Sequence, residues 1–212
     1  MCIILPVSYC HGLITGIGTT VANLRAANTK IWRFPMSKAD PDDTRELLRF
    51  ARDVYAEPGL QALCLRLQDE HQIDVVLLLT CCWYGCYCGE MSDTQLARAA
   101  GFADQWRAQL VSPLRQARRW LKPHPASAAG IPAEQQEALR RRIKALELDA
   151  EFMQLRALAA LFNEPAAATQ CSVAQATASI RANLLRYCQQ IGTAGLCETD
   201  LATLLQACLL RR

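Results

Sequence analysis

The sequence predicts an all-α protein, an irregular bundle of about six or seven helices. Ala, Leu, Gln, Arg and Glu dominate the chain and aromatic residues make up only 7%, a balance that favours helix over sheet. After residue 36, apolar residues recur every three or four positions along most of the chain, which is the spacing of a helix face. A chain of 212 residues is also long enough to bury a core without a disulfide or a metal.

Residues 1–35 differ from the rest of the chain. They contain no Asp or Glu, and neither a helical nor a strand period persists through them. Met36 then opens a stretch typical of a protein start. We therefore expect 1–35 to be an N-terminal extension, either a start-site artefact or a disordered segment, with a strand, transit segment or docking arm as the alternative. Residues 36–212 are expected to form a single all-helical domain.

The first three expected helices span 42–56, 60–70 and 74–83. The acids before and at the start of the first helix suit its N-terminus, and a Pro-Gly pair separates it from the second. The third helix is apolar nearly all round, so it should lie at the centre of the bundle. Asp74 suits its N-cap, and Gly85 and Gly89 are expected to end it.

A capping-box pattern marks the start of the next helix, where Ser92 is followed three residues later by Gln95. Gly101 is expected to bend or break this helix, and Pro113 to begin a new segment or form a kink. A linker loop rich in Pro, Ala and Ser, over 124–131, is expected to join the two halves of the domain.

The longest expected helix spans 132–163 and carries two apolar stripes. The first stripe consists of Leu139, Ile143, Leu146, Ala150, Met153, Ala157 and Ala160, and the second of Leu148, Phe152, Leu155, Ala159 and Phe162. Such a helix either packs on two sides or keeps one side for a partner. Two further helices, one capped by Ser172 and one over 199–210, are expected to pair as a C-terminal hairpin.

Three features of the first half of the domain occur together: RFARDVYAEPGLQALCLRLQDEHQIDVVLLL, then Trp83, then WRAQLVSPLRQARRWLK. In these features, over about residues 36–123, the chain resembles a proteobacterial family of small all-helical proteins of unknown function. The extension before Met36 is not part of the resemblance. The resemblance implies an all-helical fold and no mechanism.

Eleven cysteines are distributed without a C-x-x-C pair or the even spacing of a secreted disulfide framework. Cys64, Cys188 and Cys208 fall on apolar helix faces, where a free thiol packs as a small hydrophobe. Four others cluster at Cys81, Cys82, Cys86 and Cys88. We interpret these four as reduced packing residues in a cytoplasmic protein without a cofactor, with metal or redox use as the alternative.

Two charged groupings could carry a binding function. Asp69 and Asp74 flank a polar turn in the most apolar stretch, and Arg115 and Arg118 lie on a later helix. These four could line a polar pocket, or Asp74 could cap its helix while Asp69 faces solvent. The second grouping, which could contact phosphates, consists of Arg119, Lys122, Arg140 and Arg141. A net charge of only +3 and the lack of a recognisable motif make nucleic acid an improbable partner, so solvated helix faces are expected.

Together these features favour a non-enzymatic, cytoplasmic interaction or regulatory protein. The sequence contains no phosphate-binding glycine loop, no nucleophile elbow and no apolar run long enough to span a membrane. The helix over 132–163 is the expected surface for a protein partner or for self-association. The alternatives are a small-molecule site or enzyme built on the polar pocket, and a weak nucleic-acid binder.

Overall fold

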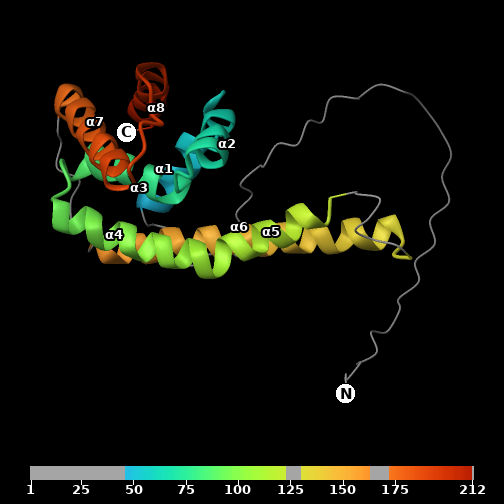
Figure 1. Cartoon of the computed structure of the whole chain (residues 1–212). Helices are drawn as coiled ribbons and strands as arrows, with labels where there is room; N and C mark the ends of the chain where they lie inside the picture. Colours follow the sequence, from blue (N-terminus) through green and yellow to red (C-terminus); the bar gives the residue numbers. More distant parts are fainter. Residues whose placement is uncertain (1–45, 123–129, 163–171, 212) are drawn as a thin grey trace, which may run out of the picture. The chain divides into compact units, whose positions relative to one another are not determined.

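The computed structural model describes residues 46–122, 130–162 and 172–211, and these residues contain helices but no strand. The helices are α1 (Glu46–Tyr55), α2 (Leu60–His71), α3 (Val75–Tyr87), α4 (Asp93–Trp106), the π-helical segment η2 (Arg107–Val111), α5 (Ser112–Trp120), α6 (Ala133–Leu161), α7 (Val173–Gln190) and α8 (Glu198–Leu210) (Figure 1). Because α4, η2 and α5 follow one another without a break, the described residues form seven separate helices. The predicted all-α bundle is confirmed.

α3 is the central helix, as its all-round apolar sequence predicts. Eleven of its thirteen residues are buried, and it contacts α1, α2, α4, α6, α7 and α8. It approaches α7 closely at Gly85, where a Cβ atom would lie 2.6 Å from the backbone nitrogen of Ile180. The prediction that Gly85 ends the helix is therefore wrong, because this glycine lies inside α3 and allows α7 to approach. Gly89, with a φ of +98°, follows the end of α3 as predicted.

The helix from α4 to α5 is continuous. The predicted capping box is present: Ser92 Oγ accepts the Gln95 backbone N–H, and Gln95 Oε1 accepts the Ser92 backbone N–H. Gly101 lies inside α4, so a break there is wrong, whereas Pro113 lies in the first turn of α5, as predicted. In η2 the Ser112 N–H donates to the carbonyl of Arg107, five residues earlier. This wider turn lies directly before Pro113, which has no N–H to donate, and lets the helix continue past it.

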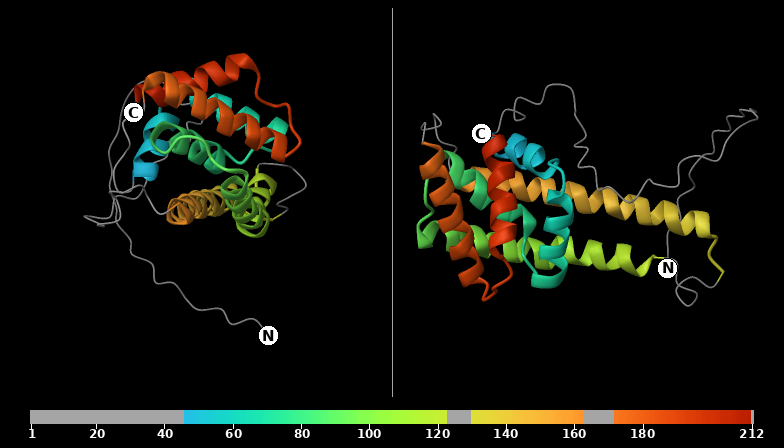
Figure 2. Two further views of the ribbon diagram at one scale, coloured as in Figure 1. Left: turned by 90° about the vertical axis from the view of Figure 1, so that its left-hand side faces the viewer. Right: turned by 90° about the horizontal axis from the view of Figure 1, so that it is seen from above.

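α6 packs along this continuous helix and against α3 (Figure 2). Its buried residues are Glu147, Ala150, Glu151, Gln154, Leu155, Leu158 and Ala159. Of the two predicted stripes, the second is the better buried, with Leu155 and Ala159 in the core. Most of the first stripe faces away from the bundle, so only one side of the helix packs. The C-terminal end of α5 and the N-terminal end of α6 extend past the other helices (Figures 1 and 2).

α7 and α8 form the predicted C-terminal hairpin and run side by side in opposite directions (Figure 2). Ser172 caps α7 through a second capping box with Gln175. Buried Asn183 accepts a hydrogen bond from the Met91 N–H at 2.7 Å and donates to the carbonyl of Gly89 at 3.1 Å. α7 therefore fixes the turn that connects α3 to α4.

Several predictions concern residues outside the described ranges. They are the N-terminal extension, the first residues of the helix expected over 42–56, and most of the loop over 124–131. Among the described helices, none combines the length and the hydropathy that a bilayer-spanning helix requires.

Candidate functional site

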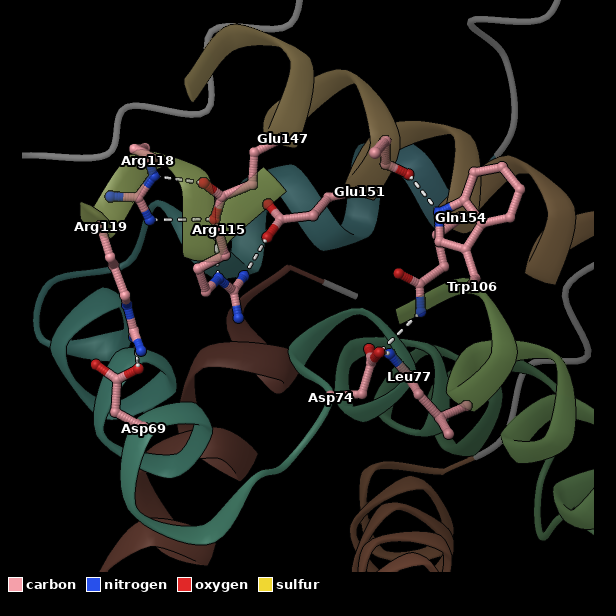
Figure 3. A network of polar contacts seen from close by, with 11 residues as sticks. Asp69, Asp74, Leu77, Trp106, Arg115, Arg118, Arg119, Glu147, Glu151 and Gln154 are labelled. Carbon is pink, nitrogen blue, oxygen red and sulfur yellow. Dashed lines mark hydrogen bonds and ion pairs between the residues drawn. The ribbon is translucent and has the colours of Figure 1, made fainter. Parts of the chain in front are cut away.

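A group of charged and polar side chains is buried between α6 and the helices that cover it. We call this group the polar seam and define it as Asp74, Arg115, Arg118, Glu147, Glu151 and Gln154 (Figure 3). Of these residues, Glu147, Glu151 and Gln154 lie on α6. Arg115 and Arg118 lie on α5, and Asp74 directly precedes α3. The three α6 residues are at most 5% exposed, and their spacing of four and three residues places them on one helix face.

Two arginines and two glutamates form the α5–α6 part of the seam. Arg118 binds Glu147 through two parallel hydrogen bonds, from Nε to Oε2 and from Nη2 to Oε1, the latter 3.2 Å long. Arg115 donates from Nε to Glu147 and from Nη2 to Glu151, each at 2.9 Å. The arginine side chains are only 11% and 13% exposed. Two positive and two negative charges thus neutralise one another in a nearly dry contact.

Asp74 forms the other end of the seam. One carboxylate oxygen accepts the Leu77 backbone N–H and the other accepts Nε2 of Gln154, both at 2.9 Å. The backbone N–H of Asp74 donates to the Tyr187 hydroxyl at 2.9 Å. Burial raises the pKa of the Asp74 carboxyl, although the hydrogen bonds from Gln154 and Leu77 oppose the shift. Asp74 is therefore the predicted N-cap of α3, and it also joins α3 to α6 and α7.

The seam fixes how α6 packs against its neighbours. A buried charge that lost its partner would pay a large desolvation cost, so sliding α6 past α5 by one turn is unfavourable. Trp106 adds a further constraint, because its indole N–H donates to the carbonyl of Ala150 at 2.9 Å. The arginines and glutamates of the seam bind one another and Asp74 binds Gln154, so the seam is a structural connection between helices.

The four residues of the predicted pocket lie in three separate contacts. Arg115 and Arg118 share Glu147, whereas Asp74 lies further along α6 beside Gln154 (Figure 3). Asp69 is elsewhere: it accepts a hydrogen bond from Arg119 at 2.5 Å in a pair whose side chains are 54% and 53% exposed. The structure thus brings the two arginines together but does not bring them to either aspartate.

The four residues considered for nucleic-acid contacts also differ in their surroundings. Arg119 pairs with Asp69, and Arg140 pairs with Glu137 at 3.2 Å. Lys122 and Arg141 are exposed. Acids therefore accompany two of the four cations, which reduces the positive charge that this surface could offer to phosphates.

The cysteines of the apolar stretch lie in the core. Cys81, Cys82 and Cys86 are fully buried on α3, and Cys88 is half-buried at its end. Burial raises the pKa of the Cys81 thiol, because a thiolate is poorly solvated there. Cys64, Cys188 and Cys208 are buried, as their places on apolar helix faces predict. In the described ranges, no cluster of three His, Cys, Asp or Glu residues is arranged to hold a metal.

α6 also has an outer face, about 100° around the helix from the polar seam, that carries large apolar side chains. We define the outer stripe as Leu139, Leu146 and Met153, which are 46%, 54% and 57% exposed. They belong to the first stripe predicted from the sequence and are spaced by seven residues, or about two helical turns. The outer stripe is the second candidate site of the molecule.

Comparison with known proteins identifies the family. Residues 46–158, more than half of the 212, match the family described as protein of unknown function (DUF2390). The match runs from α1 almost to the end of α6, so it includes the whole polar seam and the outer stripe. No curated protein and no solved structure matches the chain. The chain belongs to the DUF2390 family, whose function is unknown.

Proposed function

We propose that this protein is a cytoplasmic, non-enzymatic interaction protein that binds a protein surface through the outer face of α6. The observation that carries the proposal is where the exposed apolar side chains lie. Of the eight large ones in the described part of the chain, five fall between residues 120 and 153, namely Trp120, Ile131, Leu139, Leu146 and Met153. Three of these lie on α6, and exposed apolar side chains that gather on one surface are typical of interaction surfaces.

The polar seam, on a neighbouring face of α6, supports this proposal. Its ion pairs hold α6 firmly against α5, so the outer stripe is presented on a rigid helical hairpin. A preorganised helix loses little conformational entropy when it binds a partner. The two arginines and two glutamates of the seam pair with one another, which supports a structural role for this part of the seam.

The cytoplasmic location is proposed on the state of the cysteines. Cys64, Cys82 and Cys208 are neighbours in the core and are present as free thiols. Eight cysteines of the described residues are free, and so many unpaired thiols are expected in a reducing compartment.

The size of the native assembly tests the proposal. Leu146→Asp and Met153→Asp, each introduced into the full chain in its own cells, should lower the apparent mass of the protein in gentle cell extracts. Val173→Asp is the matched control, because Val173 is 62% exposed and lies outside the α5–α6 hairpin. An apparent mass that is equal in all three variants and the wild type would contradict the proposal, provided that circular dichroism shows each variant folded.

A further inference from the structure

The outer stripe is interrupted by two charged side chains of opposite sign. Arg142 lies between Leu139 and Leu146, and Asp149 lies between Leu146 and Met153. Both charged residues are exposed, and neither forms an ion pair with another described residue. They are seven residues apart, so they project from the same side of α6, two turns from each other.

This order of residues is its own complement when it is reversed. From the N-terminal end, α6 presents Leu139, Arg142, Leu146, Asp149 and Met153. Read from the other end, an apolar residue again comes first, and a negative charge lies within one residue of the place of the positive one. An antiparallel copy of the helix therefore offers apolar groups to apolar groups and each charge to its opposite.

We propose that the outer face of α6 binds α6 of a second copy of this chain, antiparallel, about a twofold axis beside Leu146. In this arrangement Leu146 lies against Leu146 of the partner subunit, and Leu139 lies against Met153 of the partner subunit. Arg142 faces Asp149 of the partner subunit, and the twofold axis generates the same pair again. The inference rests on the proposed interaction function and specifies its partner.

The size of the surface sets the strength expected of the dimer. From Leu139 to Met153 the helix is about 21 Å long, at a rise of about 1.5 Å per residue. One helix face of this length provides less than the roughly 800 Å² that each partner contributes to a standard interface. The dimer is therefore a reversible one, with a dissociation constant on the order of micromolar.

Charge reversal in two separate variants tests the pairing. The full-length wild type, Arg142→Asp and Asp149→Arg are purified, and their masses are followed by sedimentation velocity from ~1 to ~200 µM. The wild type is expected to move from one chain to two, and each variant to dimerise about tenfold more weakly or worse, because it sets like charges against each other. An equimolar mixture of the two variants restores the dimer, since each then offers the other two opposite charges.

The control is Arg141→Asp, which makes the same charge change about 100° around the helix from Arg142 and should leave the wild-type dimer unchanged. A wild type that remains a single chain at every concentration overturns the self-pairing, as does a dimer that both variants retain. A mixture that fails to form heterodimers overturns it as well. If the assembly in cell extracts still depends on the outer stripe after such a result, the proposed function stands with a different protein as partner.

Discussion

Arg118 and Glu147 join α5 to α6 through two parallel hydrogen bonds, and the Glu147 side chain is only 1% exposed. This pair has a matched counterpart on the surface, where Arg186 and Glu90 form an ion pair at 3.0 Å with 38% and 50% of their side chains exposed. The surface pair is more exposed and has a single hydrogen bond, whereas Glu147 accepts hydrogen bonds from both Arg115 and Arg118. The comparison therefore measures the contribution of the buried, shared carboxylate.

Glu147→Gln is expected to destabilise the protein by about 3 kcal/mol, because Arg118 loses its carboxylate in a nearly dry contact and Arg115 keeps only Glu151. Glu90→Gln should cost no more than about 0.5 kcal/mol, since water solvates Arg186 after the loss. Urea unfolding measured side by side checks the difference. Equal costs for the two variants would mean that the seam does not hold the hairpin together.

Gly85→Ala is expected to destabilise by about 1 to 3 kcal/mol, because its Cβ would lie 2.6 Å from the backbone of Ile180 and push α7 away from α3. Gly101→Ala is the control: it lies in the exposed interior of α4 with no atom within 4 Å of its Cβ. There the exchange should stabilise by about 0.5 to 1 kcal/mol, through helix propensity. Thermal unfolding of the two variants should shift in opposite directions, and a shift in the same direction contradicts the close approach of α3 and α7.

Asp74 predicts a specific pH dependence. Burial raises the pKa of its carboxyl in the folded protein above the value of about 3.9 expected for the unfolded chain. The unfolded state therefore releases the proton first as the pH rises, and the contribution of Asp74 to stability is largest below the unfolded pKa and is lost as the pH rises through the folded pKa. Asp74→Asn removes the titrating group and keeps an oxygen for the Leu77 N–H.

The unfolding free energies of wild type and Asp74→Asn are measured in urea from pH 4 upward. The value for the wild type minus the value for Asp74→Asn should decrease as the pH rises. This subtraction removes the contributions of other titrating groups that the two proteins share. A difference that is independent of pH, or one that favours the wild type at higher pH, would show that the carboxyl is not shifted upward.

Thiol reactivity tests the burial of the cysteines. Cys197 is exposed at the N-terminus of α8, whereas Cys64 is buried and its thiol has a pKa raised by that burial to about 12. In native protein, Cys197→Ser is expected to remove one rapidly reacting thiol, while Cys64→Ser removes none. Full reaction in denaturant counts all the thiols and serves as the control. Rapid modification of Cys64 in the folded protein would contradict its place in the core.

Local patterns in the sequence were sufficient for much of this fold. The all-round apolar sequence of α3 indicates a central helix, and the Ser-x-x-Gln patterns at Ser92 and Ser172 mark two helix starts that the structure confirms. Asp74 is recognisable as an N-cap for the same reason. These features depend on groups a few residues apart in the chain, so their physics is contained in a short window.

The sequence-based predictions failed at residues whose structure depends on contacts with distant segments of the chain. A glycine near the end of an apolar run, such as Gly85, suggests a helix end. Here α7, nearly a hundred residues later, requires a glycine for close packing. The tolerance of Pro113 depends on the wide turn of η2. The buried face of α6 includes Glu147 and Glu151, which can be buried because arginines on α5 compensate their charges. A spacing of four between these acids, matched by three between the arginines, was a signal that could have identified the polar seam.

For the same reason, the sequence identifies the outer stripe but does not show whether it packs inside the domain or stays exposed. The sequence shows two apolar stripes on α6, and only the packed structure reveals that Leu146 and Met153 remain exposed. The apolar period alone does not distinguish a stripe that packs inside the domain from one that binds a partner.

Photo-crosslinking from the outer stripe tests its role in binding most directly. A benzophenone amino acid is placed at position 146 or, as the control, at position 173, in the full chain expressed in its own cells. Both native residues are large, apolar and more than half exposed, so the two probes meet solvent equally in the free protein. Irradiation is expected to give a discrete higher-mass adduct from position 146 and none from position 173. Adducts of equal yield from both positions, or none from position 146, would contradict an interaction surface on the outer face of α6.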